Sequence, residues 1–194
     1  ADTKVVVIDL DLRKPKIHLG FGVENNVGIT SILIGRANID ECLHNSEIDN
    51  LKFITAGPLP PNPSEMIMSQ AFEDLLKDLQ ERFDVVIFDT PPVGLVTDGI
   101  IAMKYAVHGL YVLRAQYSKL EFSQNVNKLV DMHGFTNVSA ILNAVNTQNT
   151  YGSDYSYGYG YGYGGGYGAG YGYYEEDEVP QGIKSWKRFI PFLK

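Results

Sequence analysis

Residues 5–15 read VVVIDLDLRKP, an apolar run that ends in two acidic residues, Asp9 and Asp11. A second run of the same design, FDVVIFDTPP at residues 83–92, delivers Asp89. Continuous apolar runs predict strands whose two faces are both covered, which is typical of a parallel sheet between helices. Ligands bind beyond the carboxyl ends of such strands, so the three aspartates are predicted to share one edge of the sheet.

The alternation of strand and helix signals continues to residue 147. Further strands are predicted at residues 51–55, 109–113 and 138–142, and helices at 28–35 (with Thr30 as a cap), from about 64, and at 120–132. The helix from residue 64 follows Pro63, and its apolar side chains, spaced as on one helical face, are Met68, Phe72, Leu75, Leu76 and Leu79. This pattern predicts an α/β fold with a mainly parallel sheet flanked by helices.

The end of the chain has a different composition. Ten of its 13 tyrosines lie in residues 151–174, where Tyr alternates with Gly. They are Tyr151, Tyr155, Tyr157, Tyr159, Tyr161, Tyr163, Tyr167, Tyr171, Tyr173 and Tyr174. Glycine offers no side chain to bury and costs much entropy to order, so we expect residues 148–182, with the acidic block at 175–178, to form a disordered arm. The basic, aromatic segment 183–194 could lie at a membrane interface or dock on the domain.

Composition limits the possible functions. The chain has 194 residues, 44% of them hydrophobic, which allows one domain with a core plus a tail. Residues 1–150 carry 18 acidic and 12 basic side chains, a poor basis for binding nucleic acid. The single cysteine, Cys42, excludes an internal disulfide and is expected to be a helix-packing residue, and the four histidines lack metal-ligand spacing. Tyr105, Tyr111 and Tyr117 are likewise expected to pack inside the domain.

The strand-end aspartates have two interpretations. A single aspartate at this position often does no more than cap the following turn. Here two strands carry one, and Asp9 and Asp11 point the same way in an extended chain. Such a pair repels unless a cation or a proton resolves the repulsion, so we favour a site for Mg²⁺ and a nucleotide.

The motifs DLDLRKP, GPLPPNP and DTPP, in this order, resemble those of the bacterial tyrosine kinases that regulate capsule and exopolysaccharide export. The resemblance implies a deviant P-loop NTPase-like fold that uses ATP and Mg²⁺, with catalytic and metal-binding roles for Asp9 and Asp11 and a metal-binding role for Asp89. It implies that the tyrosine cluster is autophosphorylated in trans by a neighbouring copy in a ring-like homo-oligomer. It also implies a place at the cytoplasmic face of the bacterial inner membrane, beside the polysaccharide export machinery.

The chain departs from this family in one respect. The phosphate loop GxxxxGK[ST], with the strand before it, is expected ahead of VVVIDLD, and no such motif occurs in the 194 residues. We therefore expect residues 1–147 to be a partial kinase domain, inactive alone, whose membrane-spanning segments lie upstream.

Further nucleotide contacts are less defined. Arg13 is a candidate phosphate contact and, with Lys14, could instead meet an incoming acidic tail or remain a solvated surface charge. Asn143 is a candidate for the adenine edge, although Asn146 competes with it and a strand-end asparagine is often a turn residue.

Two other functions remain open. A partition or septum-placement ATPase would share the strand-end aspartates, but it gives no reason for a tyrosine arm. A non-catalytic assembly module would use the Tyr/Gly tract for aromatic stacking.

Overall fold

The computed structural model describes residues 2–93 and 96–145. The strands are β1 (Val5–Asp9), β2 (Leu43–Asn45), β3 (Leu51–Ile54), β4 (Val85–Asp89), β5 (Gly109–Arg114) and β6 (Val138–Asn143). The helices are α1 (Ile17–Phe21), α2 (Ile29–Leu33), α3 (Ile39–Cys42), α4 (Pro63–Ile67), α5 (Gln70–Arg82), α6 (Asp98–Met103) and α7 (Leu120–His133). The predicted arm at 148–182 with its ten tyrosines, the segment 183–194 and Asn146 lie outside the described residues.

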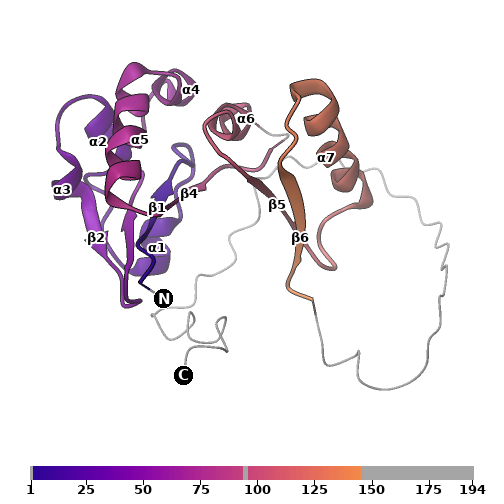
Figure 1. Cartoon of the computed structure of the whole chain (residues 1–194), viewed down its shortest axis with the longest axis horizontal. Helices are drawn as coiled ribbons and strands as arrows, with labels where there is room; N and C mark the ends of the chain where they lie inside the picture. Colours follow the sequence, from indigo (N-terminus) through magenta and orange to yellow (C-terminus); the bar gives the residue numbers. More distant parts are fainter. Residues whose placement is uncertain (1, 94–95, 146–194) are drawn as a thin grey trace.

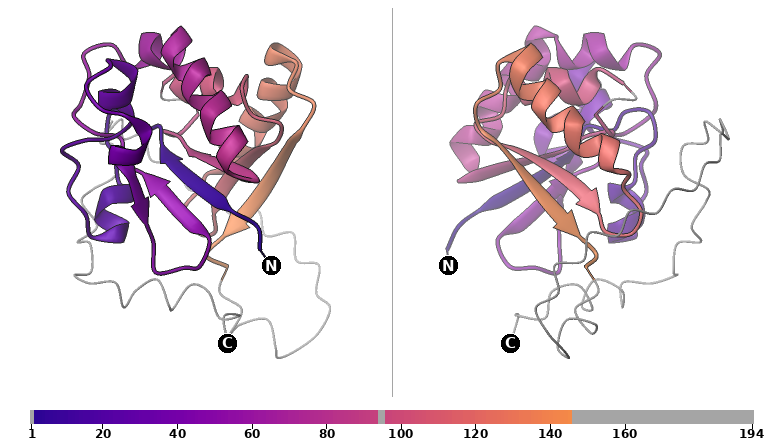
Figure 2. Two further views of the ribbon diagram at one scale, coloured as in Figure 1. Left: turned by 60° about the vertical axis from the view of Figure 1, so that its left-hand side comes forward. Right: turned by 90° about the vertical axis from the view of Figure 1, so that its right-hand side faces the viewer.

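The strands form two groups, which Figure 1 shows in sequence colours from indigo to orange. The first is a four-stranded sheet in the order β2-β3-β1-β4, where β1 is parallel to both β3 and β4 and β2 is antiparallel to β3. The second is the parallel pair β5-β6, crossed by α7 (Figure 2). The predicted α/β fold with a mainly parallel sheet is confirmed.

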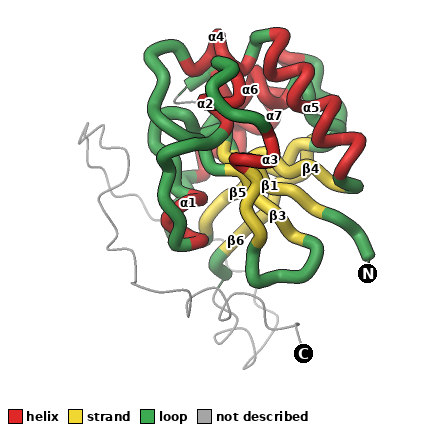
Figure 3. Tube along the Cα trace, turned by 90° about the vertical axis from the view of Figure 1, so that its left-hand side faces the viewer, coloured by secondary structure: helices red, strands yellow, loops and turns green. Residues whose placement is uncertain are grey.

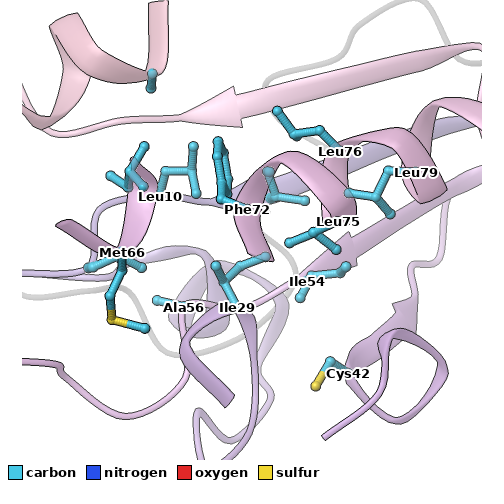
Figure 4. Packing of buried hydrophobic residues seen from close by; sticks show 14 of the residues in the cluster. Leu10, Ile29, Cys42, Ile54, Ala56, Met66, Phe72, Leu75, Leu76 and Leu79 are labelled. Atoms are coloured by element: carbon cyan, nitrogen blue, oxygen red, sulfur yellow. The ribbon is translucent and has the colours of Figure 1, made fainter. Parts of the chain in front are cut away.

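The core lies on one face of the four-stranded sheet. Four side chains of α5 that are at most 5% exposed, Phe72, Leu75, Leu76 and Leu79, form one buried cluster with Val6 and Ile8 of β1 and Ile29 of α2. Figure 4 labels the four α5 side chains and Ile29. The short helix α1 covers part of the other face, where the rings of Phe21 and Phe53 stack with centroids 4.0 Å apart. Figure 3 shows α1 and α5 on opposite sides of the strands.

The apolar runs predict strands that are covered on both faces, and among the described residues this is wrong for β4 and β5. Side chains on one face of β4 and β5 are 41% to 61% exposed: Val85, Ile87, Leu110 and Val112. The helix α1 has only five residues and lies over β3, where Phe21 stacks on Phe53. Among the described strands, β4 pairs only with β1 and β5 only with β6, so each also keeps one unpaired edge.

The helix predicted from residue 64 is two helices. The chain breaks at Ser69, whose hydroxyl accepts the backbone N–H of Phe72 and caps α5. Met68 is the C-cap of α4 and is 55% exposed, so its predicted place on the buried face is wrong. The reason is that α5 begins only after Ser69. Its four apolar positions lie on one face of α5, whereas Met68 precedes this helix and does not share that face.

Loss of this cap gives a measurable prediction. Ser69→Ala removes the acceptor for an N-terminal amide of α5, and we expect it to lower the free energy of unfolding by about 1 kcal/mol. Ser69→Asp retains an acceptor and is the control, with near-native stability in urea titrations of the 194-residue chain. An Ala variant as stable as the Asp variant would show that the hydroxyl does not cap the helix.

The start of α2 differs from the prediction for a physical reason. The N-cap is Gly28, and Thr30 lies inside the helix with a buried side chain. A Cβ at Gly28 would approach the carbonyl oxygen of Thr55 to 2.2 Å, so only glycine lets α2 begin against the end of β3. Two hydrogen bonds of 2.8 Å between Asn25 and the backbone of Gly57 hold the same junction.

The small packing predictions had mixed outcomes. Cys42 ends α3 and is fully buried, and Tyr105 meets the Phe72 ring edge-on at 5.3 Å, as expected for packing residues. Tyr117 is 52% exposed, so its predicted burial is wrong; its ring lies under the Arg114 guanidinium at 5.5 Å. In the part of the chain that the structure describes, no helix has the length and apolar character needed to cross a membrane.

Candidate functional site

The predicted aspartates meet at the carboxyl edge of the four-stranded sheet. Because β1 and β4 are parallel and in register, Asp9 pairs directly with Asp89 at their ends. Neighbouring strands lie about 4.8 Å apart, and register partners point to the same face, so these two carboxylates are neighbours. The amide of Leu10 then donates to the carbonyl oxygen of Asp89 at 2.7 Å and joins the two loops that follow.

Asp9 is fully buried and bound by its own loop. Its Oδ1 accepts the amide of Asp11 at 3.1 Å, and its Oδ2 accepts the amide of Ile17 at 3.1 Å. Burial raises the pKa of Asp9 from 3.8 to about 7; the Ile17 amide opposes this shift, and the charges of Asp89 and Asp11 add to it. A buried carboxyl that titrates near neutral pH is unusual in a purely structural role and marks a candidate site.

Asp11 and Asp89 are more accessible than Asp9. Oδ1 of Asp11 accepts the amides of Arg13 at 3.2 Å and Lys14 at 2.9 Å, so the loop closes around this carboxylate too. Asp89 ends β4 and is exposed as a residue, but its carboxyl group is partly desolvated. Its pKa is raised, first by desolvation and then by the negative charge of Asp11. The structure therefore brings three acidic side chains to one edge, as the sequence predicts.

The chemistry of this edge fits a cation. Raised pKa values at Asp9 and Asp89 mean that the site resists holding its negative charges without compensation. Within residues 2–93 and 96–145, no group of three or more His, Cys, Asp or Glu side chains is arranged to hold a metal ion by itself. Mg²⁺ commonly keeps several waters and binds through one or two carboxylates, so the donors present fit a hydrated Mg²⁺. The metal roles remain predictions.

Arg13 has a partner that sequence reasoning missed. Its Nε donates to Oδ2 of Asp98 at 2.6 Å and its terminal nitrogen donates to Oδ1 at 3.3 Å, while the Ser64 hydroxyl donates to the same Oδ1 at 2.5 Å. Asp98 is 1% exposed at the start of α6. The only signals in the sequence were an aspartate before a helix, in VTDG, and a serine after Pro63, and neither indicates a contact over such separations.

Asn143 is not brought to the three aspartates by any described contact. It ends β6, in register with Arg114 of β5, and its side-chain oxygen accepts the amide of Ala144 at 2.7 Å. This hydrogen bond is typical of a turn residue. It uses the side-chain oxygen and not the side-chain NH₂ group, so the adenine contact stays a prediction. Lys14 is exposed beside the aspartate loop.

Comparison with known proteins agrees with this architecture. The family model of the AAA domain matches residues 1–132. The putative tyrosine-protein kinase CapB of Staphylococcus aureus is 32% identical over 143 residues, which cover 74% of this chain and 63% of CapB. The chain spans between 17% and 63% of the length of the first curated relatives that it matches.

Solved structures give the same result. The kinase domain of the Escherichia coli tyrosine kinase ETK superposes with a TM-score of 0.70 at 34% identity, covering 82% of this chain and 62% of that domain. The cell division ATPase MinD of Pyrococcus furiosus superposes with a TM-score of 0.57 at 24% identity, and this likeness shows a shared fold alone. With an AAA domain over most of its length and tyrosine kinases as its relatives in both sequence and structure, the chain belongs to the bacterial tyrosine kinase family.

Proposed function

We propose that this chain is part of an ATP- and Mg²⁺-dependent protein-tyrosine kinase that phosphorylates the tyrosine cluster at 151–174 of a neighbouring copy. The observation that carries the proposal is the register pairing of Asp9 with Asp89, which puts acidic side chains at one edge of a kinase-like sheet in a chain that also holds ten clustered tyrosines. The division into a partial kinase domain at 1–147, a tyrosine arm at 148–182 and a basic segment at 183–194 follows from this proposal.

The accessible and buried acids take different roles. A phenol has a pKa near 10 and needs a proton acceptor to attack at neutral pH. Asp11 is half-buried and lies nearer the surface than the fully buried Asp9, so Asp11 accepts or orients the phenol proton. Asp9 supports the loop beneath it and shares the cation with Asp89. Bound Mg²⁺ supplies the positive charge that offsets the developing charge on the phosphoryl oxygens.

The wider setting rests on the relatives. One is named as a putative tyrosine-protein kinase in the cps region of Klebsiella pneumoniae, which supports a role beside the polysaccharide export machinery. We place the domain at the cytoplasmic face of the bacterial inner membrane. We also place it in a ring-like homo-oligomer, because a tail modified in trans requires a neighbouring copy. Asn143 meets the adenine of ATP in this proposal.

The proposal is tested in a fusion that joins this chain to the part of the ETK kinase domain that it does not cover, so that a phosphate loop is present. We expect ATP-dependent phosphotyrosine in the tail and none when all ten tail tyrosines are Phe. Asp89→Asn should slow the reaction roughly 100-fold through loss of a metal-binding charge. Asp49→Asn, which changes an exposed loop carboxylate, is the matched control and should retain the native rate.

A mixing experiment tests transfer between copies. The Asp89→Asn fusion with an intact tail is incubated with an active fusion whose tail tyrosines are Phe, and we expect phosphotyrosine on the inactive partner. ATP hydrolysis without phosphotyrosine would favour the partition or septum ATPase. Assembly that is independent of ATP, with neither activity, would favour the assembly module.

A further inference from the structure

The loop that carries the aspartates forms an ion pair in which only the carboxylate is buried: the Arg13 side chain is 39% exposed and the Asp98 side chain 1% exposed. Asp98 begins α6, Ser64 lies in α4, and Arg13 lies in the loop after β1, so one carboxylate ties together three segments that are far apart in sequence. Both Asp98 oxygens are used: Oδ2 accepts Nε of Arg13 at 2.6 Å, and Oδ1 accepts Ser64 at 2.5 Å and the Arg13 terminal nitrogen at 3.3 Å. A two-pronged arginine–carboxylate pair fixes direction as well as distance.

The same arginine is part of the loop that binds the candidate catalytic carboxylates. Its backbone amide donates to Oδ1 of Asp11 at 3.2 Å, beside the amide of Lys14 at 2.9 Å. Asp11 in turn donates its amide to Asp9 at 3.1 Å. A continuous chain of contacts therefore runs from Asp98 through Arg13 to both carboxylates. Because α6 follows β4 along the chain, this contact also sets the loop after β1 against the segment that begins with Asp89.

Asp98 needs its arginine. Burial by itself would raise the pKa of this carboxyl, but the hydrogen bonds from Arg13 and Ser64 and the arginine charge outweigh burial, and the pKa is lowered. The group is ionised at neutral pH, and moving Arg13 onto a nucleotide phosphate would leave a 1%-exposed carboxylate without a counter-charge. Such a loss is strongly unfavourable, more so than loss of an exposed pair.

We infer that Arg13 is a positioning residue: held by Asp98 and Ser64, it fixes the loop that carries Asp9 and Asp11, and it does not bind phosphate. This replaces the nucleotide contact predicted for Arg13 from the sequence. The catalytic meaning rests on the proposed function, whereas the structural coupling does not depend on it.

The coupling is measured by amide hydrogen exchange on the 194-residue chain. Asp98→Asn and Arg13→Gln should each accelerate exchange at the Arg13 and Lys14 amides by about tenfold or more, since each breaks an ion pair whose carboxylate is buried. The double variant should be no worse than either single one, because both break the same link. Ser64→Ala keeps the ion pair and should give a smaller increase in the exchange rate of these amides. It replaces Asp98→Asn as the test if Asp98→Asn fails to fold.

The matched control is Asp40→Asn. It breaks the Arg82–Asp40 pair, which is nearly as short at 2.7 Å but has Asp40 76% exposed, and should leave the loop amides unchanged. The proposal is overturned if exchange at Arg13 and Lys14 stays native in Asp98→Asn or Ser64→Ala, or if the Asp98 and Arg13 effects simply add.

Kinetics in the fusion with a phosphate loop separate positioning from phosphate binding. A positioning role predicts that Asp98→Asn and Arg13→Gln lower kcat by the same factor, roughly 10- to 100-fold, with KM for ATP changed less than about twofold. A phosphate contact predicts that Arg13→Gln raises the KM for ATP. It also predicts that Asp98→Asn leaves this KM unchanged, because the freed arginine can still reach the phosphate. That pair of results would overturn the inference. Failure of the fusion to phosphorylate tyrosine at all would count against the proposed function, while the exchange data would still decide the coupling.

Discussion

We expect the 194-residue chain to bind Mg²⁺–ATP at least about a thousandfold more weakly than the same chain fused to a strand, phosphate loop and helix of a relative. A phosphate loop contributes backbone N–H groups and a lysine to the phosphates. Hydrogen bonds to charged groups are worth about 1.5–3 kcal/mol each, so loss of three weakens binding by at least about 4.5 kcal/mol, or more than roughly 10³-fold. No GxxxxGK[ST] motif occurs in the sequence to supply them.

The sheet gives a second reason for this expectation. β4 and β5 each keep an unpaired edge among the described strands, and both show exposed apolar side chains such as Ile87 and Val112. In Figure 1, β5 and β6 follow beyond β4 on the side away from β1. Exposed, apolar strand edges are a liability that folded proteins generally cover. A parallel strand between β4 and β5 would pair with both and join the two groups of strands.

Titration calorimetry measures the expected difference, with the chain alone weaker than about 1 mM and the fusion in the micromolar range. A fusion whose loop lysine is replaced by Ala is the control: it keeps the added strand and should protect the β4 and β5 amides from exchange, yet bind ATP poorly. Micromolar affinity of the chain alone would show that the described domain holds the phosphates in a way that neither its sequence nor its fold suggests.

Much of the sheet could be predicted because its strands are strong local signals. The apolar runs at Val5–Asp9 and Val85–Asp89 predict two parallel strands. The structure has both, and their terminal aspartates meet in register. The short elements α1, α3, β2 and α6 were missed because three to six residues carry little periodicity. β2, for example, is antiparallel to β3 only because α3 returns the chain to that edge.

Only the part of the site that lies at the ends of single strands could be predicted. Asp9, Asp11 and Asp89 follow from strand ends, because parallel strands finish at a common edge. Asp98 and Ser64 could not be found in this way, because Asp98 contacts Arg13 across 85 residues and Ser64 contacts Asp98 across 34 residues. Both contacts depend on how α4 and α6 pack. Nor does the sequence reveal that Asp9 lies fully buried while Asp11 does not. The contact that closes over Asp9 comes from the start of α1, where the amide of Ile17 donates to Oδ2 of Asp9.

The burial of Asp9 leads to the second large effect, on stability and its pH dependence. The pKa of this carboxyl rises from 3.8 to about 7 on folding, with burial as the main cause. Between these pH values the folded domain binds more protons than the unfolded chain, so the domain loses stability as the pH rises through that window. At pH 8 the charged, buried carboxylate costs about 4 kcal/mol, at 1.36 kcal/mol for each pKa unit.

We therefore expect Asp9→Asn to stabilise the domain at pH 8. The amide is neutral but accepts with one oxygen where the carboxylate accepts with two, so about 1 kcal/mol is lost with one of the amide bonds from Asp11 or Ile17. The net gain is about 3 kcal/mol at pH 8. Near pH 4, where Asp9 is protonated in the folded domain and about half protonated in the unfolded chain, only the lost bond remains and the variant is slightly less stable than the native chain.

Urea unfolding of the 194-residue chain at pH 4, 6 and 8 measures this change of sign, and Asp49→Asn, at an exposed loop position, is the control for removing one negative charge. A variant that is equally destabilised at every pH would make Asp9 an ordinary cap of the loop between β1 and α1. A gain confined to high pH would mean that the fold keeps a carboxylate it would be more stable without. Residues retained against stability in this way are those that function requires, which is the role that the kinase proposal assigns to Asp9.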